Sequence, residues 1–158
     1  MREVLLATSY WIHLTASAVW IGGIIFVLFI TIPAARQVLG GESGKLMGDI
    51  SKRFAPLVNY SMISLIVTGI VIAGLNKQLS GYADFGNPWI LIIVLKLVVV
   101  SGMIGVHFFR GLVLTPRIAR TESAAIKTSL QKLSLNLVKV NLALGVLVLL
   151  FSGMAAVL

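Results

Sequence analysis

Cysteine is absent from the sequence, which excludes disulfides, thiolate metal sites and iron–sulfur clusters. Acidic side chains are almost as scarce, with 5 Asp and Glu against 13 Lys and Arg. None of the acidic residues lies within a long apolar run, which argues against a carboxylate-driven proton pump or cation exchanger. There is also no Ser–His–Asp set and no phosphate-binding glycine loop, so nothing supports hydrolysis.

Apolar residues dominate what remains: 58% of the 158 residues are hydrophobic, and the mean hydropathy is +1.02. A soluble domain of this size could not bury so much apolar surface, so the sequence predicts an integral membrane protein. The expected fold class is an all-α four-helix transmembrane bundle, formed as a single domain by residues 1–158. The predicted spans cover about residues 5–33, 56–75, 88–112 and 134–157. The first contains an Ala16-Ser17-Ala18 sequence like a signal-peptide cleavage site, but its apolar run continues to Arg36, which favours a spanning helix.

Prolines mark the expected boundaries of the helices. Pro33 is expected at the far end of the first span, before a polar loop over residues 37–53 that is also compatible with a surface helix. Pro56 suits the first turn of the second span. Asn87-Pro88 is typical of an N-cap followed by proline at the first helical position of the third span.

Basic residues are divided unequally between the two sides of the membrane. Ten follow the first or the third span: Arg36, Lys45, Lys52, Arg53, Arg110, Arg117, Arg120, Lys127, Lys132 and Lys139. Only Arg2 and Lys77 fall on the opposite side. By the positive-inside rule, both long loops lie in the cytoplasm and both termini on the outer, periplasmic or extracellular, side. We assign the net charge of +8 to this topology and to lipid headgroups, not to nucleic acid, and expect a multi-pass protein of the cytoplasmic membrane of a bacterium or archaeon.

One face of the first span combines polar, small and aromatic side chains. His13, Ala16, Ser17 and Trp20 follow helical spacing, which indicates a place where another group docks. His13 and, in the third span, Lys96 are functional candidates because ionisable groups deep in a span are costly to bury. With Met154 in the same leaflet, His13 could hold haem iron or copper, while Lys96 could bind a haem propionate, a quinone oxygen or a lipid phosphate.

A second set of candidates lies toward the cytoplasmic side. Met62, Met103 and His107 are predicted at similar depths and form a soft donor set suited to Cu(I). His107 and His13 differ in depth by very roughly 20 Å, so the two imidazoles cannot ligate one metal ion. The predicted metal ligands are therefore His13, His107, Met62 and Met103, and the predicted cofactor-binding residues are His13, Trp20, Lys96 and Met154. No catalytic residue is assigned, and the residues do not decide between a copper ion and haem b.

Simpler structural roles compete with each of these interpretations. Methionine in an apolar helix usually fills gaps, and His107 could form a hydrogen bond between helices. Arg110 and Lys139 are suited to reach the lipid headgroups. Ser61, Ser64 and Thr68 more often bond to their own helix or a neighbour than to a substrate.

Several short motifs follow one another along the chain in a characteristic order. They are His13 with Trp20-Ile-Gly-Gly, Ile32-Pro33-Ala34-Ala35-Arg36, Arg53-Phe54, Thr68-Gly69, Leu95-Lys96-Leu97, Val106-His107-Phe108-Phe109 and Val140-Asn141-Leu142-Ala143-Leu144-Gly145. Together they resemble the small membrane proteins of the copper resistance protein D (CopD) family. That resemblance implies copper handling.

The same skeleton resembles the HemJ-type protoporphyrinogen oxidase, a four-helix haem b protein. His13 with Trp20, and Lys96 with His107, match its arrangement, which implies haem binding at His13. The sequence lacks that enzyme's Pro-Arg-Leu-Phe-Val-Tyr-His continuation and its Arg-x-Asn-Glu motif before the last helix.

Three functions follow as hypotheses. The first is copper transport or handling within the bundle. The second is a haem b redox protein that exchanges electrons with quinone or oxygen species; if the chain is an enzyme, it is a haem-dependent membrane oxidoreductase. The third is a structural subunit whose polar groups only join helices. The expected partners are the lipid bilayer and a second copy or another membrane subunit, with quinone in the haem hypothesis.

Overall fold

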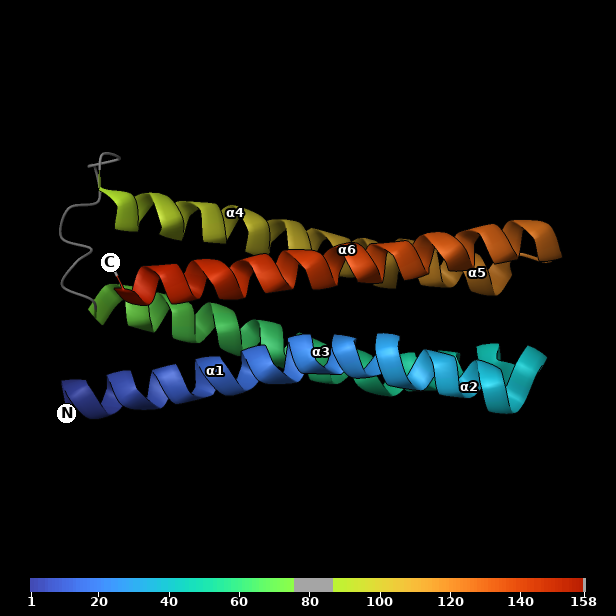
Figure 1. Ribbon diagram of the computed structural model, residues 1–158, viewed down its shortest axis with the longest axis horizontal. Coiled ribbons are helices and arrows are strands. Elements are labelled where there is room, and N and C mark those ends of the chain that lie inside the picture. Colours follow the sequence, from blue (N-terminus) through green and yellow to red (C-terminus); the bar gives the residue numbers. More distant parts are fainter. Residues whose placement is uncertain (76–86, 158) are drawn as a thin grey trace. The chain divides into compact units, whose positions relative to one another are not determined.

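The computed structural model describes residues 1–75 and 87–157, and within them every regular element is helical (Figure 1). The α-helices are α1 (Arg2–Phe26), α2 (Ile32–Leu39), α3 (Ser43–Leu75), α4 (Pro88–Phe108), α5 (Thr115–Arg120) and α6 (Ala124–Val157). The prediction of an all-α fold is therefore confirmed for this part of the chain. The predicted outer turn with Lys77 and Asp84 lies outside the described residues.

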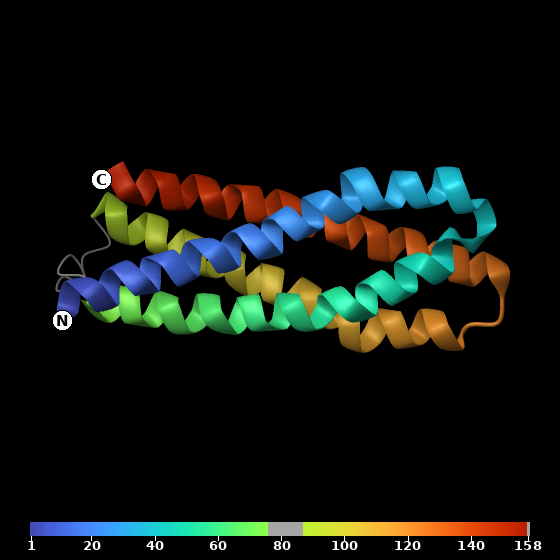
Figure 2. The same cartoon turned by 90° about the horizontal axis from the view of Figure 1, so that it is seen from below.

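The chain divides into two compact units, each a helical hairpin, and each is described by itself. In the first, α1 and α2 form one arm and α3 returns beside it (Figures 1 and 2). The reversal is made at Gly40, whose φ of +50° is in the region that favours glycine, followed by a 3₁₀ turn. In the second hairpin, α4 and α5 form the outgoing arm and α6 returns beside α4.

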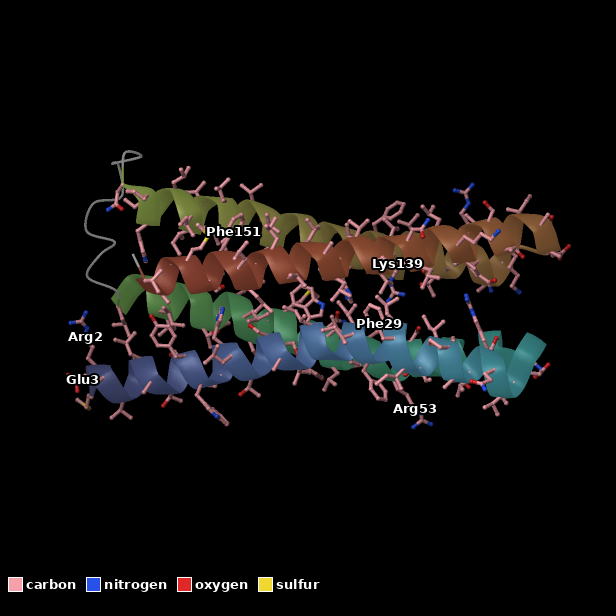
Figure 3. The ribbon with its side chains drawn as sticks, in the orientation of Figure 1. Arg2, Glu3, Phe29, Arg53, Lys139 and Phe151 are labelled. Carbon is pink, nitrogen blue, oxygen red and sulfur yellow. The ribbon has the colours of Figure 1, made fainter. Side chains whose placement is uncertain are left out.

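Contacts along the first hairpin hold its two arms close together. Gly23 of α1 faces the ring of Phe54 on α3 so closely that even a Cβ at Gly23 would lie 2.6 Å from Phe54 Cε2. At the open end, the guanidinium of Arg2 donates to the carbonyl of Leu75, the last residue of α3 (Figure 3). A positive group is favourable at that helix end because the carbonyl dipoles there lack partners.

The second hairpin begins as the sequence predicts. The side-chain oxygen of Asn87 accepts from the backbone N–H of Trp89 at 3.0 Å, with Pro88 at the first helical position. Trp89 Nε1 donates to the carbonyl of Ala155 at 3.1 Å. This bond joins the start of α4 to the end of α6, and it sets the register of the antiparallel pair.

Each outgoing arm contains a π-helical segment directly before a proline. The segments are Val27–Thr31, before Pro33, and Phe109–Leu114, before Pro116. Proline has no N–H to donate, and its ring clashes with the carbonyl four residues back, so the preceding turn widens. Threonine hydroxyls bond to carbonyls five residues back in both places, Thr31 to Phe26 and Thr115 to Arg110. The helical arm therefore continues beyond each proline.

Two prolines that were expected at helix boundaries lie inside helical arms instead. The first helical arm does not end at Pro33 but runs on to Leu39. Pro56 is not in a first turn: it lies inside α3, which starts at Ser43, so most of the predicted loop at residues 37–53 is helical. A single proline removes one helical hydrogen bond, and a long helix tolerates that loss.

Three helical stretches of the described chain are long and apolar enough to cross a membrane: Arg2–Leu75, Pro88–Arg120 and Ala124–Val157. The first has 74 residues and includes the reversal at Gly40. The structure thus gives a multi-pass helical membrane protein. The count of four spans and the location of the termini stay predictions.

Candidate functional site

His13 lies on α1 and is joined to α3 by a hydrogen bond. Its Nδ1 is 2.8 Å from Oγ1 of Thr68, a residue that is only 5% exposed. Thr68 Oγ1 in turn donates to the carbonyl of Ser64, one helical turn earlier, at 2.6 Å. Thr68 was expected to bond to its own helix or to a neighbouring one, and it does both, donating to Ser64 and contacting the imidazole on α1.

Small residues surround this imidazole. A Cβ added to Gly69 would lie 3.8 Å from His13 Cε1, which is ordinary contact distance, so the α3 backbone passes close to the ring. Ser17 Oγ donates to the backbone carbonyl of His13 at 2.8 Å and thus bonds to the backbone, not to the ring. Trp20, two turns along α1, is buried. The first hairpin therefore contains an imidazole, a close glycine backbone and a buried indole, and a docked group at this face stays a prediction.

The candidates of the second hairpin follow one stripe of α4. Lys96 is half-buried, Met103 is only 2% exposed, and His107 is half-buried. The ring of His107 packs edge-on against Phe108, with centroids 5.5 Å apart. Met103 and His107 are four residues apart on α4, so their side chains emerge on the same face of the helix. A thioether and an imidazole are thus adjacent.

Asn141 of α6 is a polar residue whose role the sequence analysis did not predict. It is 5% exposed, and its Oδ1 has no hydrogen-bond partner within the described residues. Met103 lies fourteen residues after Trp89, and Asn141 lies fourteen residues before Ala155. The Trp89–Ala155 bond therefore places Asn141 and Met103 near one level of the antiparallel pair. The sequence did contain a signal for this residue, because Asn141 is an amide side chain at the start of the otherwise apolar part of α6.

Residues 48–158 match the family model described as CopD, copper resistance protein D. The chain belongs to the CopD family. No curated protein and no solved structure matches it.

The part of the chain matched to the CopD family begins inside α3 and includes Met62, Met103 and His107. It also includes Thr68 but not His13, which precedes the matched region. The copper candidates of the sequence analysis are thus mostly residues of the CopD region. His13, the hydrogen-bond partner of Thr68, lies outside that region.

The structure brings some of the predicted site residues together and leaves others untested. His13 and Trp20 share α1, and Met103 and His107 share α4. Met62, buried on α3, belongs to the first hairpin, and Met154, 42% exposed on α6, belongs to the second. The sets that combine His13 with Lys96 and Met154, or Met62 with Met103 and His107, each draw on both hairpins and stay predictions. Within the described residues there is no group of three or more His, Asp or Glu side chains that could hold a metal ion.

Proposed function

We propose that this CopD-family protein handles copper ions within the membrane, with Met103 and His107 as a donor pair for Cu(I). The observation that carries the proposal is the family match, because its range contains both residues. Cu(I) is a soft ion that prefers thioether and imidazole ligands to oxygen. A pair one helical turn apart can contact the same ion. Copper is then the cargo of the protein.

We further propose that each hairpin crosses the membrane twice. The helices α1, α3, α4 and α6 have 25, 33, 21 and 34 residues, and about 20 apolar residues suffice for one crossing. In each hairpin, basic residues gather near the reversal between the arms. Arg53 extends outward from α3 near that end of the first hairpin (Figure 3). This distribution supports a cytoplasmic location for both reversals, with both termini outside, in the cytoplasmic membrane of a prokaryote.

The first test is metal analysis and absorbance spectroscopy on the same detergent-purified sample. We expect a protein without a Soret band that takes up Cu(I) in a fixed ratio to the chain. A sample that binds no Cu(I) above the level of a protein-free detergent control would contradict the copper proposal. A Soret band with sharp α and β bands after dithionite reduction would identify haem b in its place.

The hydrogen bond of His13 supports a second candidate function, a haem b redox protein. Metal-bound histidines commonly use their other ring nitrogen in a hydrogen bond of this kind. In this proposal His13 would hold the haem iron, and Trp20, on the same helix, would lie beside the haem. Quinone is then the proposed electron partner. A Soret band that persists in His13→Ala would contradict this assignment.

A further inference from the structure

We propose that Thr68 is a positioning residue that holds His13 in the tautomer with the proton on Nδ1, which makes Nε2 the metal-binding atom. The tautomer follows from two hydrogen bonds of Thr68, one to Ser64 and one to His13. The statement about metal binding rests on the proposed function, whether the metal is copper or haem iron.

The single hydroxyl hydrogen of Thr68 determines which ring nitrogen of His13 carries the proton. A threonine hydroxyl has one hydrogen to donate and lone pairs to accept. Thr68 Oγ1 lies 2.6 Å from the carbonyl of Ser64, which can only accept, so the hydroxyl hydrogen is used there. Oγ1 can then only accept from His13 Nδ1 at 2.8 Å, and Nδ1 must carry a proton. In a neutral imidazole the lone pair is therefore on Nε2.

The opposite tautomer would be costly at this place. With a lone pair on Nδ1, two acceptors would face each other unless the hydroxyl turned away from Ser64. Turning the hydroxyl hydrogen toward Nδ1 would break its bond to the Ser64 carbonyl, and Thr68 is too buried for water to replace that bond easily. Burial in an apolar bundle strengthens this preference, because an unmade hydrogen bond there costs about 1–3 kcal/mol.

The neighbouring hydroxyl of Ser17 does not determine which ring nitrogen of His13 carries the proton. The hydroxyl of Ser17 donates to the backbone carbonyl of His13 and leaves the ring unaffected. Ser17→Ala is therefore the matched control for Thr68→Val: both remove one hydroxyl, but only the second removes the acceptor of the ring proton. Thr68→Ser keeps the acceptor and tests whether the hydroxyl itself is required.

The test is ¹⁵N NMR of the full chain labelled at histidine, in detergent at a pH where the imidazoles are neutral. The chain has only two histidines, His13 and His107, and a His107→Gln sample assigns the signals. We expect His13 to show a protonated Nδ1 and a lone pair on Nε2 in the wild type, Ser17→Ala and Thr68→Ser. We expect Thr68→Val to shift the proton toward Nε2. A wild type protonated on Nε2, or a Thr68→Val spectrum unchanged from the wild type, would overturn the proposal.

A Cu(I) titration of the same samples separates this proposal from the proposed function. Residues that orient a metal ligand typically contribute 10–100-fold to affinity. We take His13 as a ligand separate from the Met103–His107 pair, and we expect Thr68→Val to lose affinity in that range for the metal that His13 binds, Cu(I) or haem iron, while the Met103–His107 pair keeps its Cu(I) affinity. A wild type that shows the expected tautomer but binds neither Cu(I) nor haem would refute the metal function and leave the tautomer assignment in place. If Thr68→Val fails to fold, the wild-type tautomer and the Thr68→Ser spectrum still decide the question.

Discussion

Gly23→Ala should destabilise the first hairpin by about 1–3 kcal/mol, whereas Gly22→Ala, one residue earlier, should leave it unchanged or slightly more stable. The new Cβ at position 23 would lie 2.6 Å from Phe54 Cε2 and closer still to Cζ. Either the aromatic ring or the α1 backbone must move, and overpacking of this kind costs more than the helix propensity gained. At Gly22 a Cβ would meet nothing within 4 Å, so only the gain in propensity remains.

Thermal unfolding in detergent, followed by circular dichroism, would measure this difference. Phe54→Leu in the Gly23→Ala background should recover part of the lost stability, because the shorter side chain leaves room for the new methyl group. Equal midpoints for Gly22→Ala and Gly23→Ala would show that α1 and α3 do not approach as closely as the Gly23–Phe54 contact requires.

Met103→Leu should weaken Cu(I) binding by at least about tenfold, or about 1.4 kcal/mol, while changing stability by less than about 1.5 kcal/mol. Leucine has nearly the volume of methionine, so the buried site stays filled, but the sulfur ligand is lost. Met103→Ala should lose the copper and also about 2–5 kcal/mol of stability, because it leaves a cavity at a residue that is 2% exposed.

Competition with a chromogenic Cu(I) chelator gives the affinities. Met47→Leu is the control, since Met47 lies on α3 near its start and belongs to no proposed donor set. Wild-type affinity in Met103→Leu would make Met103 a packing residue, as methionine in an apolar helix usually is. His107→Ala should match the loss in Met103→Leu if the two residues bind the same ion.

The sequence predicted the presence of the helices, but it predicted only some of the residues at which they begin and end. Asn87 and Pro88 lie as predicted because an N-cap is a local arrangement of a few consecutive residues. Pro33 and Pro56 were misplaced because proline alone does not end a helix that packing supports on both sides. A π-helical turn precedes Pro33 and Pro116 but not Pro56, so proline alone does not predict the widening.

Site prediction had the same limit. Helical spacing correctly placed His13 and Trp20 on one helix, and Met103 and His107 on another. The partner of His13 depends on the register between α1 and α3, which the spacing within one helix cannot give. The same holds for Gly23 and Phe54: both belong to motifs quoted from the sequence, yet only the packed hairpin shows why they occur together.

The paired π-helical turns and prolines make the two hairpins comparable residue by residue. His13 lies twenty residues before Pro33, and Lys96 lies twenty residues before Pro116. Trp20 and Met103 are likewise both thirteen residues before their prolines. The two hairpins therefore have the same spacing between these positions and the proline, but different side chains at equivalent positions. Where the first copy has an imidazole that can offer a lone pair, the second has an amine, and where the first has an indole, the second has a thioether.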